Sequence, residues 1–299
     1  MLSTAYSFIK HYNPSADVRL FGQEFMPQSY AVGLAEMMIK GQNIENFRNA
    51  DTFKEDCFPN IKMRFVLENP PFGTPWAGKD AKSGQEDAVR NEFKRGKDGR
   101  WGAGLPSGGD SQLIFMQSAI DKMDDNVGRA AIIENGSPLF TGGTASGESQ
   151  IRRWILEQDL LEAIVAVPEK MFYNTPISTY IWVLANKKED RRKGKVQLID
   201  ATSFKKPLRK NLGEKNCEID KNIRDYILEL YMAFDQADKL VASMISITYK
   251  LNKMCQSFDI LLNIKIFDIS SIVENFIVFP NVIRCKLTIF GNQFILQFR

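Results

Sequence analysis

The sequence has few of the residues on which disulfide-stabilised and metal-binding proteins depend. It contains four cysteines with no Cys-x-x-Cys pair, and His11 is its single histidine. Disulfide frameworks and zinc sites need several such residues at characteristic spacings, so neither is expected. Reduced thiols in a cytoplasmic protein are the simplest interpretation.

Long apolar runs and strong net charge are missing too. No run reaches the roughly 20 apolar residues that cross a bilayer, and the first residues do not resemble a signal peptide. The composition, 44% hydrophobic and 25% charged, is typical of a soluble globular protein. The net charge of +3 permits nucleic-acid binding but does not by itself indicate it.

What is present is an alternation of strand and helix patterns. Tyr30, Leu34 and Met37 recur at helical spacing, between apolar runs that end in polar residues. This alternation predicts an α/β fold with a doubly wound, mostly parallel sheet. Strands are expected within residues 17–24, 45–53, 61–73, 128–135, 161–172, 178–186 and 195–204, and helices within 3–12, 27–41, 110–123, 149–158 and 222–237.

Two segments depart from this alternation. Residues 73–110 are rich in Gly, Lys, Arg and Asp and are expected to form a long loop, functional or mobile, with one helical turn. Residues 241–299 are rich in Ile and Phe but have one glycine and one proline, so turn signals are scarce. We therefore expect a domain over 1–240 and a divergent tail over 241–299, either an unusual β segment or a sequence that is not a native domain.

The segment Asn69-Pro70-Pro71-Phe72 directly follows an apolar run. Two prolines cannot continue a central strand, because neither has an N–H to donate. Such a corner can offer the Asn69 side-chain oxygen and the Pro70 carbonyl to the two N–H bonds of a planar amine, which frees its lone pair for attack on an activated methyl group. Phe72 can stack on a base that is swung out of the helix. A plain turn is the alternative.

Two acidic residues end neighbouring predicted strands. Glu24 closes its strand, as does the acidic residue that binds ribose hydroxyls in nucleotide-binding folds. Asp51 ends the next one, where a carboxylate can accept from an adenine amino group. Taken singly, each acid is equally consistent with an ordinary surface residue. Because ligands collect at the carboxyl ends of parallel strands, these residues and the Asn69 corner predict one site.

The chain resembles the modification (methyltransferase) subunits of type I restriction–modification systems, which are S-adenosylmethionine-dependent N6-adenine DNA methyltransferases. The resemblance rests on "NPPFG", "FGQE" with "AEMMIKG", "NADTF" and the long block that begins "NGSPLFTGG". It spans roughly residues 1–240. It implies that Glu24 binds the cofactor ribose, Asp51 its adenine, and Asn69, Pro70, Pro71 and Phe72 the target adenine. It also implies DNA, a specificity subunit and a restriction subunit as partners, and no membrane.

The chain departs from this family at its start. The family's glycine-rich cofactor loop, Asp-Pro-x-x-Gly-x-Gly-Gly, is absent, and Gly22 is the only glycine in the first 25 residues. The strand before that loop is central in methyltransferase sheets, so its loss is expected to leave two unpaired strand edges. Two other functions stay open: an inactive remnant or half of a split enzyme, and a methyltransferase for protein glutamine or RNA.

Overall fold

The computed structural model describes residues 1–173, 175–237, 241–246 and 292–298. These residues form two compact units, treated separately below. Unit 1 consists of residues 1–132, 185–187 and 292–298. Unit 2 consists of residues 133–173, 175–184, 188–237 and 241–246. No helix among the described residues is long and apolar enough to cross a membrane.

Unit 1 is built on a five-stranded sheet in the order β4-β3-β11-β1-β2. β1 pairs parallel with β2, and β3 pairs parallel with β4, whereas β11 runs antiparallel to both of its neighbours. β1 and β3 are therefore parallel to each other, as the sequence predicts. The strands are β1 (Val18–Glu24), β2 (Phe47–Asn49), β3 (Phe65–Asn69), β4 (Arg129–Asn135, of which 129–132 belong to unit 1) and β11 (Asn292–Phe298).

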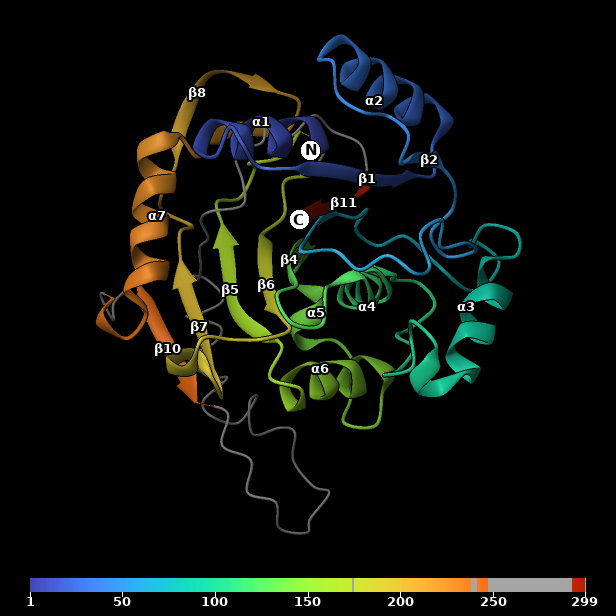
Figure 1. The fold of residues 1–299 in the computed structure, drawn as a ribbon. Helices are drawn as coiled ribbons and strands as arrows, with labels where there is room; N and C mark the ends of the chain where they lie inside the picture. The colour runs from blue at the N-terminus through green and yellow to red at the C-terminus, as the bar shows by residue number, and fades with distance from the viewer. Residues whose placement is uncertain (174, 238–240, 247–291, 299) are drawn as a thin grey trace. The chain divides into compact units, whose positions relative to one another are not determined.

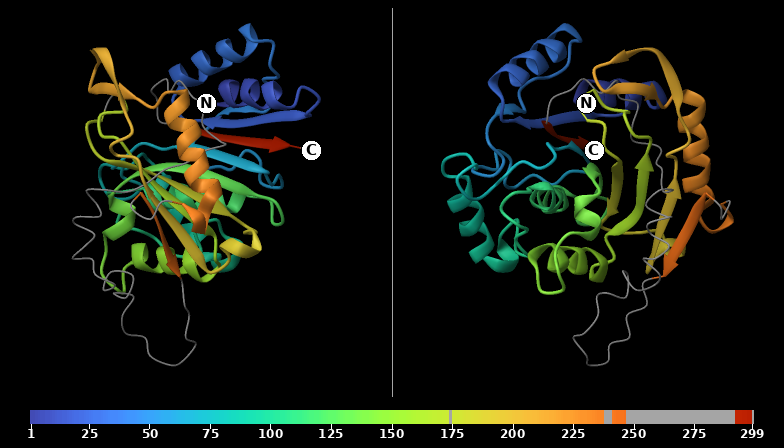
Figure 2. Two further views of the ribbon diagram at one scale, coloured as in Figure 1. Left: turned by 90° about the vertical axis from the view of Figure 1, so that its left-hand side faces the viewer. Right: turned by 180° about the vertical axis from the view of Figure 1, so that it is seen from behind.

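The prediction of two unpaired edges beside β1 and β3 is wrong, because β11 fills that position. Val18 to Gln23 pair with residues 293–298, and the same strand pairs on its other side with Phe65 to Asn69. Figures 1 and 2 both show β11, in red, running alongside β1. An extended segment satisfies backbone groups on both sides whatever its direction, so a tail strand can close the gap.

Three helices of unit 1, α1, α2 and α4, pack against its strands. α1 packs on β1 and buries Leu2 and Ala5, whereas α2 begins with Pro27 at its first turn, where no N–H is needed. α4 packs against β3. The helices of unit 1 are α1 (Leu2–Tyr12), α2 (Pro27–Ile39), α3 (Gln85–Lys94), the 3₁₀ turn η1 (Gly96–Asp98) and α4 (Gln112–Lys122).

Unit 2 contains four hydrogen-bonded strands in the order β10-β7-β5-β6. Every residue of β5 and β6 is buried, which explains their almost continuous apolar sequences. The strands are β5 (Leu161–Val167), β6 (Thr179–Ala185, of which 179–184 belong to unit 2), β7 (Lys195–Asp200) and β10 (Ala242–Ser246), with a separate hairpin of β8 (Lys206–Leu212) and β9 (Lys215–Glu218).

The helices of unit 2 are fixed by caps and buried polar contacts. The Ser146 side chain caps α6, and Asp220 caps α7. Tyr231 of α7 donates its hydroxyl hydrogen to the buried Glu162 carboxylate of β5 at 2.7 Å. The helical segments are α5 (Ser137–Phe140), α6 (Gly147–Glu157), η2 (Asp190–Arg192), α7 (Lys221–Ala233) and η3 (Phe234–Gln236).

Candidate active site at the strand ends of unit 1

The sheet register brings the carboxyl ends of β1 and β3 to one edge. Gln23 of β1 pairs with Gln293 of β11, and Gln293 pairs with Glu68 of β3. Glu24 and Asn69 therefore follow in adjacent positions at the ends of strands two places apart, roughly 10 Å between strand axes. The sequence predicted that these two residues share a site, and the register places them at the same edge.

Glu24 is a buried carboxylate with one oxygen left free. Glu24 is only 1% exposed, and its Oε1 accepts a hydrogen bond from the Met26 N–H at 2.7 Å. Its Oε2 is buried and has no hydrogen-bond partner among the described residues. Burial raises the pKa of Glu24 to about 7, against a usual value of 4.5, although the Met26 N–H partly opposes the rise. A buried, unpaired acceptor of this kind suits a ligand that brings its own hydroxyl donors.

Asp51 lies next to the Glu24 strand end and is held at both oxygens. Asn49, at the end of β2, donates its side-chain amide to the Glu24 carbonyl at 2.7 Å, and the Ala50 N–H donates to the same carbonyl at 3.1 Å. Asp51 follows directly; its Oδ1 accepts from the Phe53 N–H at 2.9 Å and its Oδ2 from Gln85 Nε2 at 2.8 Å. Each oxygen keeps a second lone pair with which to accept from a ligand.

Gln85 is a site residue that sequence reasoning missed. It is 5% exposed and begins α3, where its own Oε1 accepts from the Lys82 N–H at 3.1 Å. Its amide is a planar NH₂ group that occupies Asp51 Oδ2, as an adenine amino group would. No local signal could identify it, because 34 residues separate Gln85 from Asp51.

The Asn69-Pro70-Pro71-Phe72 corner begins as β3 ends. Pro70 is buried, whereas Asn69, Pro71 and Phe72 are half-buried, and Gly73 turns the chain with a φ of +64°. Among the described residues, no hydrogen bond reaches the Asn69 side-chain amide and no ring contacts Phe72. Both groups therefore remain available for a ligand.

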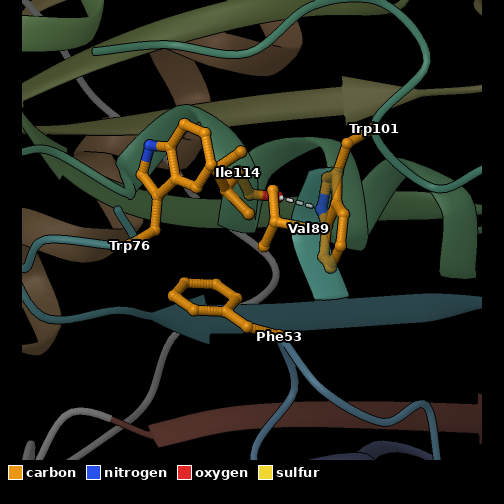
Figure 3. Close-up of a cluster of buried hydrophobic side chains, with 5 residues drawn as sticks. All are labelled: Phe53, Trp76, Val89, Trp101 and Ile114. Atoms are coloured by element: carbon orange, nitrogen blue, oxygen red, sulfur yellow. Dashed lines mark hydrogen bonds between the residues drawn. The ribbon is translucent and has the colours of Figure 1, made fainter. Parts of the chain in front are cut away.

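The segment that follows the corner is more ordered than its composition suggested. It contains α3, a ten-residue helix where one helical turn was expected, and it returns so that the Trp76 N–H bonds the Gly108 carbonyl at 2.9 Å. Trp76, Val89 and Trp101 are almost fully buried with Phe53 and Ile114. Figure 3 shows these five side chains pointing toward one another, with the Trp101 Nε1 bonded to the Ile114 carbonyl. This cluster packs beside Asp51, since Phe53 is two residues away.

The raised pKa of Glu24 predicts a specific dependence of stability on pH. A folded-state pKa of about 7 lies above the usual 4.5, so the stability that this group contributes is full below pH 4.5 and is lost as the pH rises through 7. Between pH 5.5 and 8 the loss is on the order of 2 kcal/mol. We expect Glu24→Gln to remove this part of the pH dependence, measured by urea unfolding at both pH values.

Glu36→Gln is the matched control for that experiment. Glu36 is a partly exposed carboxylate whose pKa is lowered, chiefly by the hydrogen bond from Lys40. Removing the Glu36 carboxylate should leave the difference in the free energy of unfolding between pH 5.5 and pH 8 as it is in the wild type. An unchanged difference in Glu24→Gln as well would contradict the assignment of the buried charge to Glu24.

The comparisons with known proteins identify the family. The family model described as N-6 DNA Methylase matches residues 1–253, most of the chain. This chain belongs to the N-6 DNA methylase family. The resemblance stated from the sequence is thereby confirmed, and so is the α/β fold class.

Relatives of this N-6 DNA methylase include subunits of type I restriction enzymes. The HindI methylase subunit of Haemophilus influenzae is 31% identical over 186 residues, covering 62% of this chain and 38% of that protein. The MjaVII methylase subunit of Methanocaldococcus jannaschii is 29% identical over 235 residues, covering 76% of this chain and 38% of that protein. The chain thus spans less than two fifths of the length of these relatives.

A solved structure supports the fold independently. The methyltransferase subunit of a type I restriction–modification system from Streptococcus thermophilus superposes with a TM-score of 0.61 at 26% sequence identity. The match covers 76% of this chain and 44% of that one. The N-6 DNA methylase described here therefore shares its fold with part of a type I subunit.

Proposed function

We propose that this chain carries the catalytic site of the modification subunit of a type I restriction–modification system. The complete enzyme transfers a methyl group from S-adenosylmethionine to N6 of adenine in DNA. One observation supports this most strongly. The Asn69 corner and the Glu24 carboxylate, whose Oε2 has no hydrogen-bond partner among the described residues, lie at the same edge of the sheet. Specificity and restriction subunits are the proposed partners, and DNA is the proposed substrate.

The residues present fit the adenosine half of the cofactor. Glu24 Oε2 needs a donor, and a ribose hydroxyl supplies one. Asp51 accepts from the adenine amino group with its remaining lone pairs, and Gln85 holds that carboxylate in place. The methionine half has no such candidate in the described part of unit 1, so the assignment covers the adenosine half alone. When bound, S-adenosylmethionine supplies an electrophilic methyl group.

The Asn69 corner holds the acceptor in this proposal. Asn69 Oδ1 and the Pro70 carbonyl accept the two N–H bonds of the target amine, which localises the lone pair of its nitrogen. Phe72 stacks on the extruded base, a contact worth about 1–3 kcal/mol. No general base is needed if attack precedes loss of the proton, so these residues act by placement and polarisation.

Methyl transfer with a labelled cofactor tests the proposal. The folded chain is incubated with tritiated S-adenosylmethionine and a duplex that contains adenine, and with a duplex of G·C pairs alone as control. Label recovered as N6-methyladenine from the first duplex only is the expected result. Label in protein or RNA would instead support the alternative acceptors, and no label in any acceptor would overturn the assignment of catalysis to this chain.

A further inference from the structure

The β8–β9 hairpin is a separate two-stranded sheet that sequence analysis did not identify. β8 is exposed along almost its whole length, and no third strand joins the pair among the described residues. Figure 1 labels β8 apart from the strands of the unit 2 sheet. Because an isolated two-stranded hairpin is marginally stable, its order requires anchoring from elsewhere in the unit.

That anchoring comes from the segment after β5. Cys217 of β9 is 2% exposed and its thiol donates to the Glu169 carbonyl at 3.4 Å. The Asn216 N–H donates to the Lys170 carbonyl at 3.0 Å, and the Glu214 N–H donates to the Tyr173 carbonyl at 2.8 Å. The hairpin is therefore held along β9, which leaves β8 as its outer strand.

The hairpin concentrates positive charge. Residues 205–218 carry five lysines and arginines against two glutamates, a net charge of +3 that equals the net charge of the whole chain. Lys206 lies 3.8 Å from the carboxylates of Glu218 and Asp220. The other four cations have no carboxylate within ion-pair distance in the described part of the chain: Lys205, Arg209, Lys210 and Lys215.

This pattern differs from that of exposed helix positions where a cation and a carboxylate lie one turn apart. Several exposed cations on helices pair with a carboxylate one turn away, as Arg153 does with Glu157 at 2.6 Å and Arg90 with Glu86 at 2.8 Å. Such pairs neutralise one another. The hairpin cations stay uncompensated, and this is the arrangement that attracts a polyanion.

An exposed aromatic ring completes the surface. Tyr173 is 45% exposed, and its ring lies against the turn of the hairpin: a Cβ added at Gly213 would come within 3.2 Å of ring atoms and 2.7 Å of the Tyr173 carbonyl oxygen. Gly213 also has a φ of +61°, which other residues rarely adopt. Glycine at the turn therefore leaves room for the Tyr173 ring and carbonyl.

We propose that the β8–β9 hairpin is a contact surface for the phosphate backbone of duplex DNA. The inference rests on the proposed function, because that function makes DNA the substrate. A duplex carries one negative charge per roughly 1.7 Å, and cations that neutralise its phosphates release counterions. Arg209 and Lys210 lie on the exposed β8, Lys205 directly precedes it, and Lys215 is a half-buried residue of β9. These four cations match this chemistry and carry no base-reading geometry, so the contact is independent of sequence.

Fluorescence anisotropy with a labelled 30-base-pair duplex tests the inference in the full chain. The test variant changes Lys205, Arg209, Lys210 and Lys215 to Gln. The control variant changes four exposed cations outside the hairpin to Gln: Lys187 of unit 1, and Arg191, Lys193 and Lys221 of unit 2. Both variants lose four positive charges, so a general charge effect acts equally on both.

The salt dependence decides the outcome. We expect the hairpin variant to bind about 10- to 100-fold more weakly, with the slope of log K against log salt reduced by about 2–4, and the control variant to change little. Equal slopes in wild type and hairpin variant would overturn the inference while leaving DNA methylation intact, and would favour an acidic protein as the occupant. Failure of the wild type to bind any duplex would overturn the proposed function as well.

Discussion

Trp101→Ala is expected to cost about 3–5 kcal/mol of the free energy of unfolding. Trp101 is fully buried, and its Nε1 donates to the Ile114 carbonyl at 3.1 Å and to Ser118 Oγ at 3.0 Å. The Arg100 guanidinium lies 4.2 Å from the Trp101 ring centroid, and the Phe53 ring meets it edge-on. Truncation removes all of these contacts and leaves a cavity between Phe53, Val89 and Ile114. Urea unfolding measures the effect.

Trp101→Phe separates packing from hydrogen bonding in the same position. It keeps one six-membered aromatic ring but loses the pyrrole ring and both Nε1 hydrogen bonds, so a cost of about 1–3 kcal/mol is expected. In the Ala variant, amide hydrogen exchange should increase in residues 73–110 before it increases elsewhere in unit 1. A loss below about 1 kcal/mol for Trp101→Ala would show that this segment does not stabilise unit 1.

Asn69→Ala is expected to lower the rate of methyl transfer by about 10²- to 10³-fold, the usual effect of removing one preorganised polar group. Stability should change little, because no internal hydrogen bond to the Asn69 amide is lost in the described structure. The change removes the acceptor for the target amine and leaves the Glu24 end of the site in place. Initial rates with saturating cofactor and duplex measure it.

Asn43→Ala is a suitable control, since Asn43 is an exposed asparagine of unit 1 whose amide bonds only the neighbouring Glu45. Its transfer rate should equal that of the wild type. A transfer rate for Asn69→Ala within threefold of the wild type would exclude Asn69 from the acceptor site.

The strand-end residues were predictable because the signals for them are local. An apolar run that ends at Glu24, and another that ends at a double proline after Asn69, mark where strands stop. Parallel pairing then brings those ends to one edge, as the register of β1, β11 and β3 shows. These assignments needed only the period of the sequence and the geometry of proline.

The contacts between distant segments could not be predicted in this way. Gln85 reaches Asp51 across 34 residues, and Trp101 is buried within a segment whose charge and glycine content indicate a loop. Partners so far apart are chosen by tertiary packing, which overrides local composition. The position of β11 is a similar case, because nothing in residues 292–298 specifies pairing with β1.

The β8–β9 hairpin escaped prediction for a different reason. Sequence patterns identify a strand by alternation of buried and exposed residues, but β8 is exposed on nearly all of its positions and has no apolar face to alternate. Its anchoring lies in the backbone of β9 and in Cys217. The positive charge of the segment was visible in the sequence, yet only the structure places it on a hairpin whose first strand is exposed.

Isothermal titration with S-adenosylmethionine at pH 8, where Glu24 is ionised, tests the central claim most directly. We predict saturable binding by the wild type and by Asn69→Ala, and about 10- to 100-fold weaker binding by Glu24→Gln, the loss expected for a hydrogen bond to a charged group. No binding by the folded wild type, or equal binding by Glu24→Gln, would contradict a cofactor site at the carboxyl ends of β1 and β2.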